Sequence, residues 1–192
     1  VGARRMVSIS SFRIEALETM TQPIWEPTPA QVAGTNMAAF MADVGARESI
    51  DVSDYATLYR FSIEEPEKFW LAAWDFCDVI TEIRGKTVVR NLDRMPGATW
   101  FPEARLNFAE NLLRYRDDQP AIIFQGEGQP RRTMTYAELY DQVSRLAKAM
   151  RAHGIKAGDR IAGFVPNMPE AIVAMLAATS IGAIWSSCSP DF

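Results

Sequence analysis

The chain has 192 residues, of which 48% are hydrophobic and 23% are charged, so it can bury a substantial core. Its formal net charge of -4 offers no long-range attraction to nucleic acid phosphates or anionic membranes, and neither partner is expected. The two cysteines, Cys77 and Cys188, are too few for a disulfide-stapled secreted scaffold, and we predict buried thiols in a cytoplasmic protein.

The first part of the chain, to about residue 113, contains short helical patterns without alternating strands and helices. Residues 1–20 mix charges into the stretch where a signal peptide needs an apolar run, so no export is expected. Thr28 followed by Pro29 predicts the start of a helix. Ser62 to Glu65 fits a capping box and predicts that a second, largely apolar helix begins there. We interpret this part as a helical extension docked on a larger body.

The pattern changes at Pro120. Residues 121–124 and 131–134 predict two strands joined by a Gly-containing turn, which together form a β-hairpin. Thr135 to Glu138 is a second capping box, and it begins a long amphipathic helix that Gly154 ends. The apolar stripe of this helix consists of Leu139, Val143, Leu146 and Met150.

A strand, a helix and a further strand are predicted after this helix. Residues 159–165 read as a buried strand, and Asn167 with Pro169 marks a helix start. Residues 171–190 carry no charge, but their hydroxyl side chains and the break at Gly182 favour a helix and a buried strand over a membrane span. The order strand, helix, strand, helix, strand predicts right-handed crossovers and a parallel sheet.

The predicted fold class is therefore α/β. We expect a helical extension over residues 1–113 and the beginning of a doubly wound, largely parallel sheet domain over residues 114–192. The last strand ends just before Phe192, at the edge where parallel sheets bind ligands. Because a domain ending there would have an open sheet edge, we expect it to be incomplete and prone to self-association.

No local motif for catalysis was found. The G-x-x-x-x-G-K-[ST] phosphate loop does not occur, and Gly126 and Gly128 fit a hairpin turn instead. The single histidine, His153, lies at a predicted helix end, where the helix dipole explains it better than general base catalysis. Two cysteines and one histidine far apart do not form a zinc site, and no carboxylate cluster suits a hard cation, so no metal site is predicted.

Residues 135–192 resemble the early region of the adenylate-forming acyl-CoA synthetases. The shared features are the capped helix, a G-x-x-x-G-D turn from Gly154 to Asp159, the strand into Asn167-x-x-Glu170, and an L-A-x-x-x-x-G-A run ending at Ala183. Their joint occurrence is far more specific than any one of them.

Residues before position 135 indicate which branch of this family the chain resembles. Tyr59–Ser62 before Pro66–Trp70 is similar to the amino-terminal extension of the acetyl-CoA and acetoacetyl-CoA synthetase branch. The segments that most resemble the acetoacetyl-CoA synthetases are Trp100–Pro102, Asn107–Leu113 and Trp185–Phe192.

This resemblance implies an acid–thiol ligase that joins acetoacetate to coenzyme A. In such enzymes ATP, with Mg²⁺, and a carboxylate form an acyl-adenylate and pyrophosphate, and the CoA thiol then displaces AMP. The family's phosphate loop, nucleotide contacts, acyl pocket and adenylation lysine would all follow Phe192. The resemblance therefore implies that residues 1–192 contain no catalytic residue and are inactive alone.

The resemblance places one ligand-contacting segment of the family within this chain. In the acetyl-CoA branch, the segment just after the last strand contacts the CoA nucleotide, and Ser189, Pro190 and Asp191 occupy it here. That branch has an aromatic residue and glycines at this place, and an Asp beside a phosphorylated ligand would be repulsive unless offset. Contact with CoA and a simple strand-ending turn are both open readings.

Two other functions are also open. Within the ligases, the acid could be acetate, propionate or another short acid, because the acyl pocket lies outside this sequence. In a different class, the chain could be a standalone module that binds a nucleotide or a partner without turnover. The missing sheet strands argue against the module.

Overall fold

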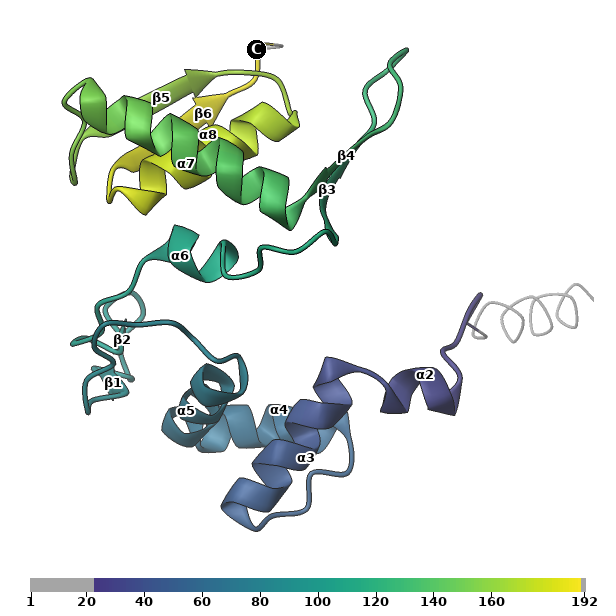
Figure 1. Ribbon diagram of the computed structural model, residues 1–192. Coiled ribbons are helices and arrows are strands. Elements are labelled where there is room, and N and C mark those ends of the chain that lie inside the picture. Colours follow the sequence, from purple (N-terminus) through teal and green to yellow (C-terminus); the bar gives the residue numbers. More distant parts are fainter. Residues whose placement is uncertain (1–22, 191–192) are drawn as a thin grey trace, which may run out of the picture. The chain divides into compact units, whose positions relative to one another are not determined.

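The computed structural model describes residues 23–190, which divide into two compact units at Ala72 and Ala73 (Figure 1). The helices are α2 (Pro29–Ala33), α3 (Asn36–Glu48), α4 (Tyr55–Glu64), α5 (Pro66–Phe76), α6 (Phe108–Leu112), α7 (Tyr136–Ala152) and α8 (Pro169–Ser180). The strands are β1 (Val89–Arg90), β2 (Thr99–Trp100), β3 (Pro120–Phe124), β4 (Arg132–Thr135), β5 (Arg160–Phe164) and β6 (Ile184–Cys188).

The described part of the first unit, residues 23–72, contains helices joined by loops and no strand. The predicted start at Thr28 is confirmed, because the Gln31 backbone N–H donates to the Thr28 hydroxyl at 3.3 Å and the Gln31 side chain accepts from the Thr28 N–H at 2.8 Å. In α3, Phe40 and Val44 are buried, and the Phe40 ring packs edge-on against Phe69 at 5.7 Å between centroids. Helices are therefore present over residues 23–72, as predicted, and the extent of the extension to residue 113 stays a prediction.

The capping box predicted at Ser62–Glu65 is wrong. Helix α4 begins earlier, where Asp54 accepts a 2.7 Å hydrogen bond from the Thr57 backbone N–H. Ser62 lies within this helix, and its hydroxyl donates to the Tyr59 carbonyl at 2.7 Å. A serine bonded back to its own helix does not cap the next one. The following helix, α5, begins at Pro66, so the proline is indeed in a first turn.

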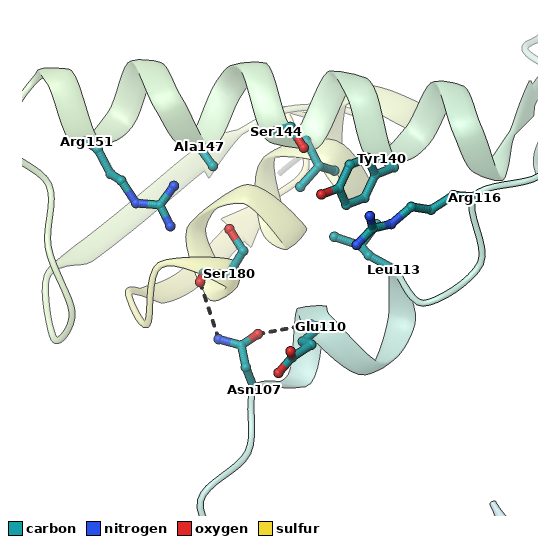
Figure 2. Close-up of a pocket in the computed structure, with 10 residues that line it drawn as sticks. Asn107, Glu110, Leu113, Arg116, Tyr140, Ser144, Ala147, Arg151 and Ser180 are labelled. Atoms are coloured by element: carbon teal, nitrogen blue, oxygen red, sulfur yellow. Dashed lines mark hydrogen bonds between the residues drawn. The ribbon is translucent and has the colours of Figure 1, made fainter. Parts of the chain in front are cut away.

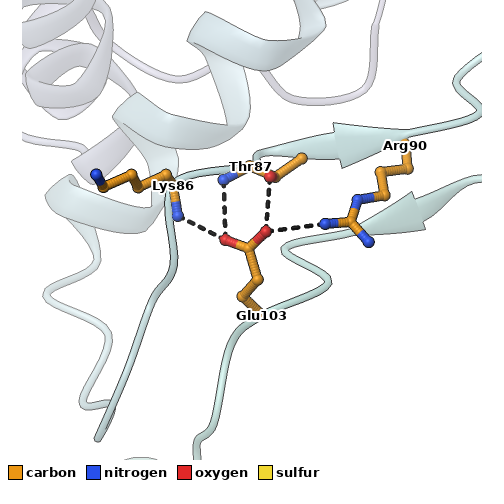
Figure 3. A network of polar contacts seen from close by, with 4 residues as sticks. All are labelled: Lys86, Thr87, Arg90 and Glu103. Carbon is orange, nitrogen blue, oxygen red and sulfur yellow. Dashed lines mark hydrogen bonds and ion pairs between the residues drawn. The ribbon is translucent and has the colours of Figure 1, made fainter.

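A carboxylate holds together the loop that carries β1 and β2 (Figure 3). Glu103 accepts hydrogen bonds from the backbone N–H groups of Lys86 at 2.7 Å and Thr87 at 3.2 Å, and from the Thr87 hydroxyl at 2.7 Å. Arg90 adds an ion pair at 3.0 Å. These donors, the Thr87 hydroxyl first, lower the pKa of Glu103 to about 2. We call this group the Glu103 clasp.

Gly85 permits the close approach of the clasp. Its φ of +83° lies in the left-handed region, and a Cβ at this position would collide with the Glu103 side chain. The short β1–β2 pair beside it is antiparallel, with Val89 opposite Trp100. Strand β1 is only two residues long.

The predicted hairpin and capped helix are confirmed in the second unit. Strands β3 and β4 pair antiparallel, and Thr135 then caps α7 by accepting from the Glu138 N–H at 3.2 Å, while the Glu138 side chain accepts from the Thr135 N–H at 2.8 Å. At the other end His153 is the C-cap, and Gly154 follows with a φ of +83°. The left-handed turn at Gly154 explains why this helix stops there.

The core of the second unit lies between α6, α7 and α8. Helix α8 packs along α7 (Figure 1), and Ala109 in α6 and Leu113 just after it add apolar side chains to the same core. The buried residues of this core are Ala109, Leu113, Met134, Leu139, Val143, Ala147, Val173, Leu176 and Ala177. Two of the four stripe residues predicted for α7, Leu139 and Val143, are buried, and the other two, Leu146 and Met150, are half-buried against the same core.

Strands β5 and β6 pair in parallel, as predicted, with Arg160 opposite Ile184 and Phe164 opposite Cys188. Helix α8 is the crossover between them. The preceding strand, β4, pairs only with β3 among the described strands, so the parallel pairing holds for one crossover and not for two. The hairpin gives β4 an antiparallel partner next to it in sequence, which explains this difference.

Two smaller predictions are wrong. Met168, and not Asn167, is the N-cap of α8, and it makes no side-chain capping bond. Cys77 and Cys188, predicted to be buried, are both exposed. Over residues 23–190, no helix combines the length and the hydropathy needed to cross a bilayer.

Candidate functional site

The predicted site follows the last strand of the parallel pair. Phe164 and Cys188 are opposite each other at the carboxyl ends of β5 and β6, and the Val165 backbone N–H donates to the Cys188 carbonyl at 3.2 Å. Ser189 and Pro190 come next, with Ser189 half-buried and Pro190 exposed. Asp191 lies outside the described residues. The first two residues of the predicted site therefore lie at the sheet edge where parallel folds bind ligands.

The amino-terminal end of α8 is close to this edge along the chain. Helix α8 begins at Pro169, five positions after β5 ends at Phe164. Its N-cap, Met168, contributes no side-chain hydrogen bond, and proline has no N–H to satisfy. The partial positive charge of a helix start favours a negative group. An acidic side chain of the protein already occupies the first turn.

That acidic side chain is Glu170, and it is paired. Arg132, on β4, donates a 2.7 Å hydrogen bond to the Glu170 carboxylate. This bond lowers the pKa of Glu170, so the carboxylate stays ionised at neutral pH. The pair joins the β3–β4 hairpin to the start of α8 and neutralises the charge there. The electrostatics of this edge are therefore set by an internal ion pair.

The Asn107–Leu113 segment, which the sequence identified only by resemblance, has a structural role. The Asn107 carboxamide oxygen accepts from the Glu110 N–H at 3.1 Å and caps α6, while its amide nitrogen donates to the Thr179 carbonyl at 3.0 Å. One side chain thus begins α6 and satisfies a carbonyl in the last turn of α8. An asparagine directly before a short apolar helix is an N-cap signal that the sequence reading did not use.

Asn111 forms the second polar link of this segment. Its carboxamide accepts from the Ile80 N–H at 2.8 Å and donates to the Ile80 carbonyl at 2.9 Å. It also donates to the Asn107 carbonyl at 3.0 Å and accepts from Arg114 at 2.9 Å. All four hydrogen-bonding positions of the amide are satisfied. Residues 80 and 111 are far apart in sequence, so periodicity could not reveal this contact.

Two family models match the chain. Residues 55–112 match "acetyl-coenzyme A synthetase N-terminus", and residues 108–192 match "AMP-binding enzyme". The first match covers α4 to α6, and the second covers the hairpin and the β5–α8–β6 crossover.

Individual proteins give longer matches. The chain is 49% identical over 171 residues to an acetoacetyl-coenzyme A synthetase of Rhizobium meliloti (strain 1021), a match that covers 89% of this chain and 26% of that protein. It is 40% identical to a malonamoyl-CoA synthetase of Penicillium aethiopicum over 82% of this chain and 23% of that protein. The solved structure of an acetoacetyl-CoA synthetase from Streptomyces lividans matches with a TM-score of 0.81 and 39% identity, over 89% of this chain and 27% of that chain. The chain thus spans about a quarter of the length of the relatives it matches.

Proposed function

We propose that the complete protein is an acetoacetate–CoA ligase, because residues 108–192 match the AMP-binding enzymes and most of the chain is similar to the amino-terminal part of acetoacetyl-CoA synthetases. The observation that carries the proposal is the 49% identity to a bacterial acetoacetyl-coenzyme A synthetase over 89% of this chain. The TM-score of 0.81 supports it, because the match includes the helical extension as well as the parallel crossover.

The proposed reaction has two steps. The acetoacetate carboxylate attacks the α-phosphorus of ATP, which forms acetoacetyl-AMP and releases pyrophosphate. The sulfur of coenzyme A then attacks the acyl carbon, AMP leaves, and the products are acetoacetyl-CoA and AMP. ATP and CoA follow from the family, and Mg²⁺ is proposed as the ion that accompanies ATP.

We assign residues 1–113 to the amino-terminal extension and residues 114–192 to the first part of the AMP-binding domain. The match to the acetyl-coenzyme A synthetase N-terminus ends at residue 112, and the hairpin and the crossover both follow residue 113, which supports this division. Residues 1–192 alone would be inactive. A preparation of this length should release no pyrophosphate from ATP and acetoacetate, and measurable ATP–pyrophosphate exchange would contradict this and favour a different division of the enzyme.

We propose that Ser189, Pro190 and Asp191 contact the nucleotide of CoA in the complete protein. Support comes from their place after β6, at the carboxyl edge of the parallel pair. Because a carboxylate repels phosphates, Asp191→Ala should lower the KM for CoA and leave the KM for ATP unchanged. Asp118→Ala, an exposed loop residue, is the matched control. Equal KM values for CoA in all three proteins would favour a simple turn.

Two further proposals concern the cellular location of the protein and its self-association. We propose a cytoplasmic location, which agrees with substrates that are soluble small molecules. We also propose that the β5–β6 pair promotes self-association when residues 1–192 are isolated, since Phe164 and Ile184 are 68% and 52% exposed. Sedimentation of this portion should reveal oligomers, and a monodisperse monomer would contradict the second proposal.

The second candidate is a ligase for another short acid. The match to a malonamoyl-CoA synthetase favours it, because that protein is named for a different acid yet is 40% identical over 82% of this chain. The decisive assay measures kcat/KM of the complete protein for acetoacetate, acetate, propionate and malonamate with ATP and CoA. We expect acetoacetate to give the highest value. A higher value for any of the other acids would replace the leading proposal, and no turnover of any acid would favour a non-catalytic module.

A further inference from the structure

A pocket of about 420 Å³ lies between α6, α7 and the end of α8 (Figure 2). Small-molecule sites commonly have volumes of roughly 300–1,000 Å³, so this pocket is large enough for a small organic ligand. Its apolar lining consists of Leu113, Val143 and Ala147, which belong to the buried core. A ligand in the pocket would therefore rest on a rigid apolar surface.

Helix α7 presents a row of side chains to this pocket. Tyr140, Ser144, Ala147 and Arg151 follow one another at spacings of four, three and four residues, which places them on one face of a helix. Figure 2 shows them in this order along α7. The row offers two hydroxyl groups and one guanidinium. These groups can donate hydrogen bonds to an anion.

A second guanidinium lies at the opposite end of the pocket from Arg151. The Arg116 guanidinium carbon is 3.9 Å from the centre of the Tyr140 ring. This stacking orients the guanidinium plane and leaves the N–H groups at its rim for a ligand. Within residues 23–190, neither Arg116 nor Arg151 forms a salt bridge. Arg145, on the same helix, instead pairs with Asp141 at 2.6 Å.

The net charge of the side chains that line the pocket limits the charge of the ligand it can bind. Arg116, Arg151 and Glu110 contribute two positive charges and one negative charge, a net charge of +1. A single negative charge balances this net charge, whereas a doubly charged phosphate would leave an excess negative charge in the filled pocket. The other polar side chains nearest the floor are already used, because Asn107 bonds to Thr179 and the Ser180 hydroxyl donates to the Ala177 carbonyl.

We propose that this pocket binds an organic monoanion, a carboxylate attached to a short apolar chain. Arg116 or Arg151 holds the carboxylate through paired N–H donors, the Tyr140 and Ser144 hydroxyls assist, and the apolar chain lies on Leu113 and Val143. The binding site lies wholly within residues 107–180. It does not depend on the ligase reaction proposed above, and its test needs no turnover.

The test is arginine labelling of the complete protein by phenylglyoxal, with peptide mass spectrometry as the readout. Hexanoate is the probe, hexanamide its uncharged match, and inorganic phosphate the anion without an apolar part. Hexanoate should slow the labelling of Arg116 and Arg151 at least threefold, with no effect on Arg145. Hexanamide should not protect, and phosphate should protect less than hexanoate.

Several outcomes would overturn the proposal. Equal protection by hexanamide would show that charge is not recognised, and stronger protection by phosphate would assign the pocket to inorganic anions. No protection by any probe would exclude a binding site. Unreactive Arg116 and Arg151 in the absence of a probe would show that another part of the protein fills the pocket.

Variants give an independent measurement by calorimetry with hexanoate. Arg151→Gln removes one charged donor and should weaken binding about tenfold. Ser144→Phe fills the pocket without a change of charge and should abolish measurable binding. The control is Arg145→Gln, which alters a guanidinium on the same helix outside the lining and should leave the affinity unchanged. Wild-type affinity in both Arg151→Gln and Ser144→Phe would refute the site.

Discussion

Asn111 offers the sharpest test of how the second unit is held together. Its amide makes four hydrogen bonds, and two of them satisfy both backbone groups of Ile80. Asn111→Ala would leave the Ile80 N–H and carbonyl without their partner in a half-buried setting. An unsatisfied group costs roughly 1–3 kcal/mol, and partial access of water lowers the sum, so we expect a loss of about 2 kcal/mol in unfolding free energy.

The measurement is urea denaturation of the protein, monitored by tryptophan fluorescence. Asn111→Asp separates geometry from donor chemistry, because the carboxylate still accepts from the Ile80 N–H but repels the Ile80 and Asn107 carbonyls. It should destabilise at least as much as alanine. Asn167→Ala is the matched control, since Asn167 is exposed and makes no hydrogen bond within the described residues. An Asn111→Ala variant within about 0.5 kcal/mol of the wild type would refute the argument.

Three other substitutions test the clasp, the core and a cap. The Glu103 carboxylate has its pKa lowered from 4.5 to about 2, so it stabilises the folded state above pH 4.5, and this contribution is lost as the pH falls toward 2. Glu103→Gln should flatten the acid limb of the plot of urea midpoint against pH, and an unchanged limb would contradict the role of the clasp. Leu176 is 2% exposed, so Leu176→Ala should cost about 2–5 kcal/mol in the same assay, whereas a loss below about 1 kcal/mol would mean that this core is loosely packed. Thr135→Ala removes the cap of α7 and should cost about 1 kcal/mol, with exposed Thr133→Ala as the control that should cost less.

Local signals gave the correct elements in the second unit. The capping box at Thr135, the left-handed turn at Gly154 and the hairpin depend on neighbouring residues, so the sequence was sufficient to predict them. The parallel pairing of β5 with β6 was also predicted, because a helix between two apolar strands gives a crossover. The prediction of a second crossover was wrong, because the hydrophobic pattern of a strand does not specify which other strand pairs with it.

The polar contacts between residues far apart in the sequence could not be predicted from the sequence. The Glu103 clasp joins residues 13 to 17 positions apart, and Asn111 contacts a residue 31 positions away. A carboxylate or an amide in a loop looks like any solvated side chain until the fold brings its donors together. The pocket between α6, α7 and the end of α8 has the same origin, since Arg116 and Arg151, which line it, are far apart in the sequence. Ser189 and Pro190 directly follow β6, a position that required only the last strand to be predicted, and their contact with CoA stays a prediction.

The L-A-x-x-x-x-G-A run explains why residues that resemble a ligase family can be structural. Leu176 and Ala177 are buried in the core against α7, and Ala183 is buried at the start of β6. Between them Gly182 has a φ of +79°, its carbonyl accepts from the Gly158 N–H at 3.0 Å, and a Cβ would approach Ala157 to 3.0 Å. Any larger residue at this position would strain the turn that connects the crossover helix to its strand. The run is therefore required to place β6 beside β5, and with it the edge that carries Ser189 and Pro190.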